Sequence, residues 1–144
     1  MRNRVAVLHG VNLDMLDRRP AEHYGGLSLS ELEYRVERFA RELGLEVTFF
    51  QTNHEGEYVE ELHRSSDYAD GLVLNPGAWT HYAWALRDAL EIAALPAVEV
   101  HLSDVHARES FRGESVIREV CVATVAGRGV EGYREALERL KPAL

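Results

Sequence analysis

Short apolar runs alternate along the chain with longer segments in which apolar residues recur every three or four positions. The short runs are rich in β-branched residues, and they predict buried strands over residues 4–10, 45–51, 71–75, 97–100 and 118–127. The longer segments predict helices over residues 28–44, 57–69, 81–94 and 130–140. This regular alternation indicates an α/β protein whose parallel sheet is covered by helices on both faces.

The predicted helix over residues 28–44 carries signals at both ends. Ser30 and Glu33 have the spacing of a capping box at its start, and Gly44 is a typical residue just past a helix end. Its apolar residues fall on one face: Leu32, Val36, Phe39, Ala40 and Leu43. In the next predicted helix, the residues expected to face the core are Tyr58, Leu62 and Ala69.

The order of the predicted elements favours one particular sheet. Five strands connected in this way fit the flavodoxin-like doubly wound fold, with strand order 2-1-3-4-5, in a single domain over residues 1–144. In such sheets, ligands bind outside the carboxyl ends of the strands. The segments that leave those ends are residues 9–26, 51–57, 75–81 and 101–112. Most of them are dense in Asn, His, Arg and Tyr, so we expect them to converge on one site.

Charge and composition exclude several classes of protein. The formal net charge of −8 and the pI near 5.3 argue against sequence-independent binding of nucleic acid. No apolar stretch of about 20 residues is present, so we expect no membrane-spanning segment. Residues 1–10 lack the apolar core of a signal peptide. The single cysteine, Cys121, cannot form an internal disulfide and is expected to be a small core residue of a cytoplasmic protein.

Motifs for the common cofactors are missing as well. The turn after the first predicted strand has neither a dinucleotide-binding fingerprint nor a P-loop, so we expect no bound nucleotide. A phospho-acceptor receiver domain would need an aspartate where the third strand ends in Asn75. Lys141, near the end of the chain, is the only lysine, which excludes a buried Schiff-base amine. No zinc motif connects the possible ligands, so we expect no metal at His81, Glu99, His101 and His106.

Acid–base chemistry on an anion is what these residues favour. The two longest loops at the predicted site carry the arginines Arg18, Arg19, Arg108 and Arg112. Guanidinium groups bind carboxylates in a bidentate way, and they stabilise a neighbouring phenolate such as that of Tyr24. Glu99 and His101 alternate with apolar residues and therefore point to one side of their strand. A carboxylate beside a histidine fixes its tautomer, which suits a general acid.

Three stretches of the sequence resemble the type II 3-dehydroquinate dehydratases (type II dehydroquinases). They are HGVNLDMLDRRPAEHYG at residues 9–25, NPGAWTHYAWALRDA at residues 75–89 and VEVHLSDVHARESFR at residues 98–112. Each one follows a predicted strand, and their spacing agrees with the family pattern over nearly the whole chain. The resemblance implies a hydro-lyase that removes water from 3-dehydroquinate by trans-elimination through an enolate, without a cofactor or a metal.

The resemblance also implies roles for individual residues in the chemistry. Tyr24 would be the base, held as phenolate by Arg19 and Arg108, and residues from about Asp17 to Gly25 would form a lid. Asn12 would orient a water molecule on the enolate oxygen. The remaining pair implied for catalysis is the acid with its orienting carboxylate, His101 and Glu99.

Substrate binding and assembly are implied in the same way. The substrate carboxylate would lie against the backbone of Leu102 and Ser103, with Asn75, while His81 and Arg112 would hold ring hydroxyls. Asp88 would reach in from a neighbouring subunit of a homo-oligomer. In the family, trimers assemble into a dodecamer.

The chain departs from the family pattern at positions beside the implied site. These are His9, Val11, Asp17, Pro20, Ala21, Pro76, Trp79, Tyr82, Trp84 and Asp104. Two alternatives to the shikimate-pathway enzyme therefore stay open. One is a dehydratase of the same mechanism acting on a related substrate, such as an amino analogue of dehydroquinate in secondary metabolism. The other is a catalytically retired binding protein that keeps the fold.

Overall fold

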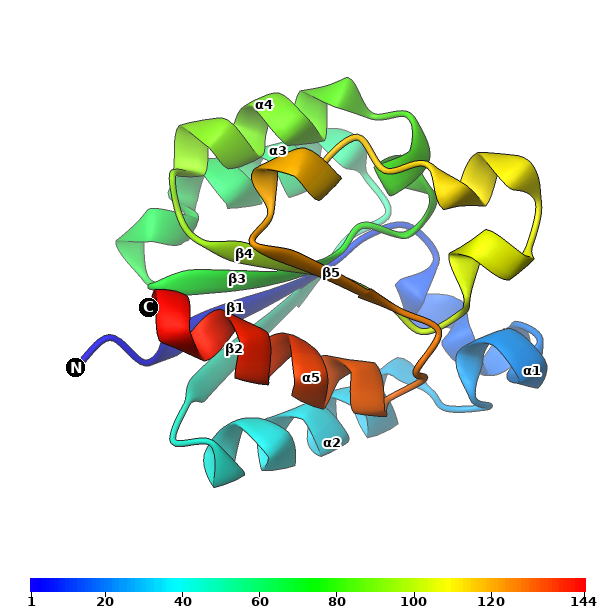
Figure 1. Cartoon of the computed structure of the whole chain (residues 1–144), viewed down its shortest axis with the longest axis horizontal. Coiled ribbons are helices and arrows are strands. Elements are labelled where there is room, and N and C mark those ends of the chain that lie inside the picture. The colour runs from blue at the N-terminus through cyan, green and yellow to red at the C-terminus, as the bar shows by residue number, and fades with distance from the viewer.

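The computed structural model describes residues 1–144 and contains one twisted parallel sheet between two layers of helices (Figure 1). Its strands are β1 (Arg4–His9), β2 (Glu46–Gln51), β3 (Gly71–Asn75), β4 (Ala97–His101) and β5 (Ala123–Ala126). All neighbouring strands are parallel, and the order across the sheet is β2-β1-β3-β4-β5. The predicted α/β class and strand order are therefore confirmed.

Helices cover both faces of the sheet. On one face lie α2 (Leu29–Glu42) and α5 (Glu131–Leu140), and on the other lie α3 (Glu55–Arg64) and α4 (Trp84–Ala93) (Figure 1). The short helix α1 (Ala21–Tyr24) belongs to the long connection after β1 and lies at the end of the molecule far from both termini (Figure 1). No helix is both long enough and apolar enough to cross a membrane.

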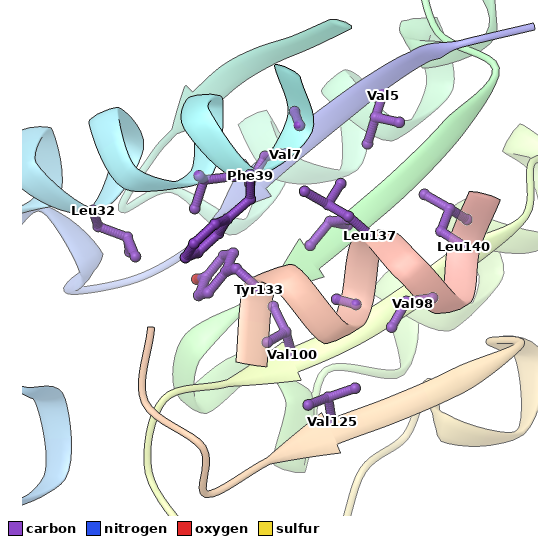
Figure 2. Close-up of a cluster of buried hydrophobic side chains, with 14 of the residues drawn as sticks. Val5, Val7, Leu32, Phe39, Val98, Val100, Val125, Tyr133, Leu137 and Leu140 are labelled. Carbon is purple, nitrogen blue, oxygen red and sulfur yellow. The ribbon is translucent and has the colours of Figure 1, made fainter. Parts of the chain in front are cut away.

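Each face of the sheet buries an apolar cluster against its helices. Figure 2 shows the cluster under α2 and α5, where Leu32, Phe39, Tyr133 and Leu137 pack on valines of β1 and β4. The predicted inward residues of the first two long helices are found in these clusters. Leu32, Val36, Phe39 and Ala40 are buried with Leu43 packed beside them, and Tyr58, Leu62 and Ala69 are buried on the other face.

The capping box of the first long helix lies two residues earlier than predicted. Ser28, not Ser30, is the N-cap: its backbone is extended, and its Oγ accepts a hydrogen bond from the Glu31 N–H. The Ser28 hydroxyl also contacts the Glu31 carboxylate. Ser30 already has a helical position inside α2, so the predicted Ser30–Glu33 box is wrong. Only the residue with extended backbone can turn its side chain toward the first unpaired N–H groups.

The fifth strand is shorter than predicted. Residues 118–120 form a 3-10 turn, and pairing with β4 begins only where Val98 meets Ala123. Since β4 itself starts at Ala97, residues 118–121 have no strand beside them to pair with. Cys121 is consequently outside the strand and only half-buried, packed against the edge of the core. Burial, together with the charge of Glu99, raises the pKa of its thiol to about 12.

Two predicted helices also divide into an α-helix and a 3-10 turn. In the segment 81–94, His81 is the last residue of a 3-10 helix (Gly77–His81), and α4 begins only at Trp84. In the segment 57–69, α3 is followed by a 3-10 turn (Ser65–Asp67). The first of these turns carries His81 to the carboxyl end of β3, which is why it matters for the site.

Candidate active site

A pocket opens at the carboxyl ends of β1, β3 and β4, which are neighbours in the sheet. Three of the four segments that the sequence places at this edge line it. The lining residues are Val11, Asn12, Leu13, Arg19, Tyr24, Asn75, Gly77, Ala78, His81, His101, Leu102, Ser103, Val105, Arg108 and Arg112. Of the residues predicted for the site, Glu99, Asp88 and Arg18 are not among them.

The remaining segment, residues 51–57, does not line the pocket but forms hydrogen bonds to the loop that does. The Asn53 side chain accepts a hydrogen bond from the backbone N–H of Asn12 at 2.8 Å and donates one to Asp14 at 3.1 Å. These bonds hold Asn12 in a left-handed backbone conformation, with φ of 69°. The backbone N–H of Asn12 is thereby used within the protein, and the side chain remains to line the pocket.

Close backbone packing brings the first and third loops together at Gly77. Its φ is +68°, and a Cβ atom added there would lie only 2.6 Å from the carbonyl oxygen of Val11. Glycine is therefore required both for the backbone conformation and for the approach of the two loops.

The acid side of the pocket is built on β4. Glu99 is fully buried, and its Oε2 lies 2.6 Å from Nε2 of His101. Thr80 donates to the same oxygen, and Ser115 donates to Oε1 at 2.7 Å. Burial opposes ionisation of Glu99, but the bonds and charge of His101, with the two hydroxyl donors, outweigh it and lower the pKa of the carboxyl. Because His101 binds Glu99 through Nε2, its Nδ1 is the ring nitrogen left for a ligand.

His81 lies beside His101 with its ring nearly parallel, at a centroid distance of 6.4 Å and an angle of 17°. Its Nδ1 donates to the carbonyl of Glu114 at 2.7 Å, since a carbonyl can only accept. Partial burial lowers the pKa of His81, and the charges of His101 and Arg112 act in the same direction against the bond to Glu114. The neutral ring therefore carries its hydrogen on Nδ1 and has Nε2 as an acceptor.

The base side of the pocket is built on loops. Tyr24 ends α1 and is buried, and the left-handed Gly25 follows it. Arg108 donates from Nη1 to the Tyr24 hydroxyl at 2.7 Å, and the Arg19 guanidinium lies 4.0 Å from the centre of the Tyr24 ring. Arg108 also reaches Ser103 Oγ at 3.3 Å, while its buried Nε has no partner. Two positive charges thus lie against one phenol.

A third group of polar atoms lies between these two sides. Asn75 accepts from the N–H of Gly77 at 3.2 Å and donates to the Tyr133 hydroxyl at 3.0 Å, which fixes the orientation of its amide. The carbonyls of Leu102 and Ser103 accept from Gly129 and Gly127 and so anchor the backbone of this pair to the loop after β5.

Arg112 and Asp88 differ in their distance from the pocket. Arg112 lines it, contacts the carboxylate of Glu109 through Nε and lies over the ring of Phe111 at 4.8 Å. Asp88 is exposed on the outer side of α4 and does not line the pocket of its own chain. No group of three or more His, Cys, Asp or Glu side chains is placed to hold a metal ion.

Comparison with known proteins identifies the family. The sequence model of the dehydroquinase class II family matches residues 3–141. The chain belongs to the class II dehydroquinase family. A protein of Thermotoga maritima named 3-dehydroquinate dehydratase is 50% identical over 141 residues, which cover 98% of this chain and 96% of the relative. A protein of Halothermothrix orenii with the same name is 49% identical over 138 residues, covering 96% and 93%.

Solved structures of class II dehydroquinases agree with this assignment. The crystal structure of the type II dehydroquinase from Butyrivibrio crossotus superposes with a TM-score of 0.92 at 35% identity, covering 97% of this chain and 98% of that one. The family resemblance seen in the three sequence stretches is therefore confirmed.

Several polar residues at this dehydroquinase-type pocket escaped the sequence analysis. Thr80 and Ser115 contact Glu99, and the hydroxyl of Tyr133 lies 2.8 Å from Nε2 of His9. His9 is fully buried, its Nδ1 has no partner, and burial lowers its pKa to about 4. Only the three-dimensional structure shows these contacts, because they join residues that lie far apart in the sequence. In the sequence, Thr80 stands beside His81 and His9 ends a predicted strand, but neither position signals a partner.

The bulky departures from the family pattern lie away from the pocket. Trp79 is buried against Tyr58, with ring centres 5.7 Å apart, while Tyr82 and Trp84 are exposed. None of the three lines the pocket, whereas Val11 does. The aromatic residues around His81 therefore do not narrow the pocket of their own chain.

Proposed function

We propose that this chain is a 3-dehydroquinate dehydratase, a hydro-lyase that forms 3-dehydroshikimate by trans-elimination of water through an enolate. One observation carries the proposal. A single pocket contains a phenol held by two arginines and an imidazole held by a buried carboxylate. These are a base and an acid, each with its own charge partner, as an elimination requires. The names of the relatives support the choice of substrate.

Tyr24 is the proposed base. As phenolate it takes the proton from C2 of the substrate, and the electron pair of the broken C–H bond moves into the enolate. Arg108 stabilises the phenolate by a charge-assisted hydrogen bond, and Arg19 does so from the face of its ring. The side chain of Asn12 would hold a water molecule against the enolate oxygen.

His101 is the proposed acid. In its protonated form it gives the Nδ1 proton to the hydroxyl that leaves C1, and this group departs as water while the enolate electrons form the new double bond. Glu99 stabilises the imidazolium through Nε2 and keeps Nδ1 directed to the pocket. No other group is needed to balance the step.

The remaining lining residues are proposed to bind the substrate. Its carboxylate would lie at the backbone of Leu102 and Ser103 with the amide of Asn75, whose orientation is fixed from below by Tyr133. Ring hydroxyls would contact His81, through its acceptor Nε2, and Arg112.

We also propose a homo-oligomer in which Asp88 completes the site of a neighbouring subunit, in trimers that form a dodecamer. The exposed side of α4 that carries Asp88 is apolar around it, since Trp84 and Ile92 are 63% and 66% exposed and Tyr82 beside them is 60% exposed. Such a patch is typical of a protein interface. The single cysteine agrees with a cytoplasmic location, where disulfides are rare.

Mixing two inactive variants tests the shared site. Asp88→Ala subunits keep Tyr24, and Tyr24→Phe subunits keep Asp88, so a mixed oligomer contains complete sites. Activity that appears only after dissociation and reassembly of the mixture is the expected result. No recovery in oligomers shown to be mixed would place Asp88 outside the site.

The alternative substrate stays testable by direct competition. The aromatic departures do not reach the pocket of their own chain, which favours 3-dehydroquinate over an amino analogue. The ratio of kcat/KM for the two compounds decides between them, and it also decides between a biosynthetic and a secondary pathway.

The central experiment is absorbance on mixing the protein with 3-dehydroquinate, since loss of water conjugates the carbonyl and creates an enone band. We expect a rapid rise with the wild type and none above background with Tyr24→Phe. Turnover by Tyr24→Phe would remove Tyr24 as the base. A flat trace from folded wild-type oligomer would favour a retired binding protein or another substrate.

A further inference from the structure

We propose that Thr80 and Ser115 are positioning residues, which act through Glu99 to keep His101 able to donate its proton. The inference rests on the proposed function of His101 and adds two residues outside the pocket to the machinery. Neither side chain lines the pocket, so neither touches the substrate directly.

The hydrogen bonds around Glu99 account for both of its oxygens. Oε2 accepts from Thr80 and faces Nε2 of His101, while Oε1 accepts from Ser115. Glu99 has no exposed surface, so its donors come from the protein and not from bulk water. A carboxylate with this set of donors is held in one orientation and in its ionised form.

The direction of the Ser115 bond follows from its other contacts. Ser115 Oγ accepts from the backbone N–H groups of Ile117 at 3.3 Å and Arg118 at 3.1 Å. Its single hydroxyl hydrogen is therefore available for Oε1 of Glu99, and it points there at 2.7 Å. Because the oxygen is held by the 3-10 turn that begins at Arg118, Ser115 is a fixed donor and not a freely rotating one.

Thr80 and Ser115 belong to two segments that are fastened to each other. The N–H of Val116 donates to the carbonyl of Thr80 at 2.8 Å, and His81 donates to the carbonyl of Glu114 at 2.7 Å. The same two segments carry His81 and Arg112 to the pocket. The donors of Glu99 are thus fixed to the walls of the site that Glu99 serves.

Few charges other than His101 face Glu99. From α3, Tyr58 is neutral because burial raises its pKa, and from the edge of β5 the thiol of Cys121 is neutral for the same reason. From the 3-10 helix before α4, partial burial lowers the pKa of His81. None of these groups is a cation that stabilises the Glu99 carboxylate. When His101 is neutral, the ionised carboxylate is therefore stabilised by the hydroxyl donors of Thr80 and Ser115.

The pH dependence of kcat tests the inference. Thr80→Val replaces the hydroxyl by a methyl group of similar size. Ser115→Ala removes the hydroxyl, and with it the acceptor for the N–H groups of Ile117 and Arg118. Turnover needs both the Tyr24 phenolate and the ionised Glu99, so both contribute to the acid limb of the kcat profile. Each variant removes a donor to Glu99 and favours its protonated form, so this limb should move up, by at most about one pH unit. The shift should be larger in the double variant, while KM stays within about twofold because neither residue touches the pocket.

Thr80→Ser is the matched control, because it removes a methyl group and keeps the hydroxyl. It should retain the wild-type profile. If Thr80→Val and Ser115→Ala lower kcat at every pH and leave the acid limb in place, the two residues only support the fold and the inference is overturned.

A second measurement separates this inference from the proposed function. The carboxyl carbon of Glu99, followed by ¹³C NMR in the intact protein, should titrate at higher pH in both donor-deleting variants than in the wild type or Thr80→Ser. This shift is expected even if the wild type fails to turn over 3-dehydroquinate. An unchanged Glu99 titration overturns the inference whatever the activity.

Discussion

The two sides of the pocket are built in different ways. On the acid side, His101 ends β4, a strand paired on both sides, and Glu99 is fully buried with donors on both oxygens. On the base side, Tyr24 ends a helix of four residues within a long loop, and its partners are one hydrogen bond from Arg108 and the stacked guanidinium of Arg19. The buried Nε of Arg108 has no partner there.

This difference indicates when each side becomes ready for chemistry. The strand fixes the acid side together with the core, so it forms as the protein folds. The base side depends on one conformation of the loop that carries Arg19 and Tyr24. A site assembled from a rigid half and a loop half can admit substrate before the loop completes it. Mutations should therefore affect the two sides through different observables.

The largest expected effect comes from Arg108. Arg108→Met keeps much of the side-chain length and removes the charge and the bond to the Tyr24 hydroxyl. General-base contributions are about 10²–10⁴-fold, so we expect kcat to fall by at least about 100-fold. Steady-state kinetics of the variant and the wild type measure the loss.

Arg18→Met is the matched control, because Arg18 is exposed and lies outside the pocket although it neighbours Arg19. It should leave kcat and KM unchanged. A loss of only a few fold in Arg108→Met would show that Arg19 alone maintains the base.

The sequence predicts the acid side better than the base side. Glu99 and His101 follow from strand alternation, because a period of two places both on one face of β4. The convergence of the loops follows from strand order, which the alternation of elements predicts. Those features are decided by backbone geometry that is the same in every parallel sheet.

Contacts between distant segments do not follow from any local pattern. Ser115 lies beyond the recognised stretches and meets Glu99 only because the 3-10 turns after β4 bring it back. Tyr133 is one of several buried residues of α5, yet its hydroxyl joins Asn75 to His9. The start of β5 was likewise predicted from the apolar pattern alone, whereas the point at which β4 begins decides it.

His9 provides a test of how rigid the strand-borne half is. Burial lowers its pKa from the usual 6.5 to about 4, so the unfolded chain binds more protons than the folded chain between these values. Stability is therefore unaffected by His9 above pH 6.5 and falls as the pH drops toward 4. By pH 5 the loss amounts to about 2 kcal/mol, or about 30-fold in the unfolding equilibrium.

His9→Gln removes this titration and keeps a group able to bond Tyr133. Urea unfolding at pH 7 and pH 5 should show a smaller acid loss in the variant, by the same amount, when protein concentration is held fixed because association adds to stability. Equal losses in both proteins would mean that the folded state accepts a proton on His9, and that this half of the site is looser than its burial indicates.

The smallest expected effect compares two glycines in the same conformation. Gly25, just after Tyr24, and Gly44, after α2, have φ of +76° and +74°, and a Cβ added at either one meets nothing within 4 Å. Alanine at each position therefore costs only the free energy of adopting the left-handed conformation, about 1 kcal/mol.

If the loop forms its closed state separately from the core, Gly25→Ala lowers kcat by up to about tenfold and leaves Tm unchanged. Gly44→Ala should lower Tm by about 2–4 °C and leave kcat unchanged. The opposite result, with Tm falling and kcat preserved in Gly25→Ala, would mean that the loop folds with the core and that the base side is as preformed as the acid side.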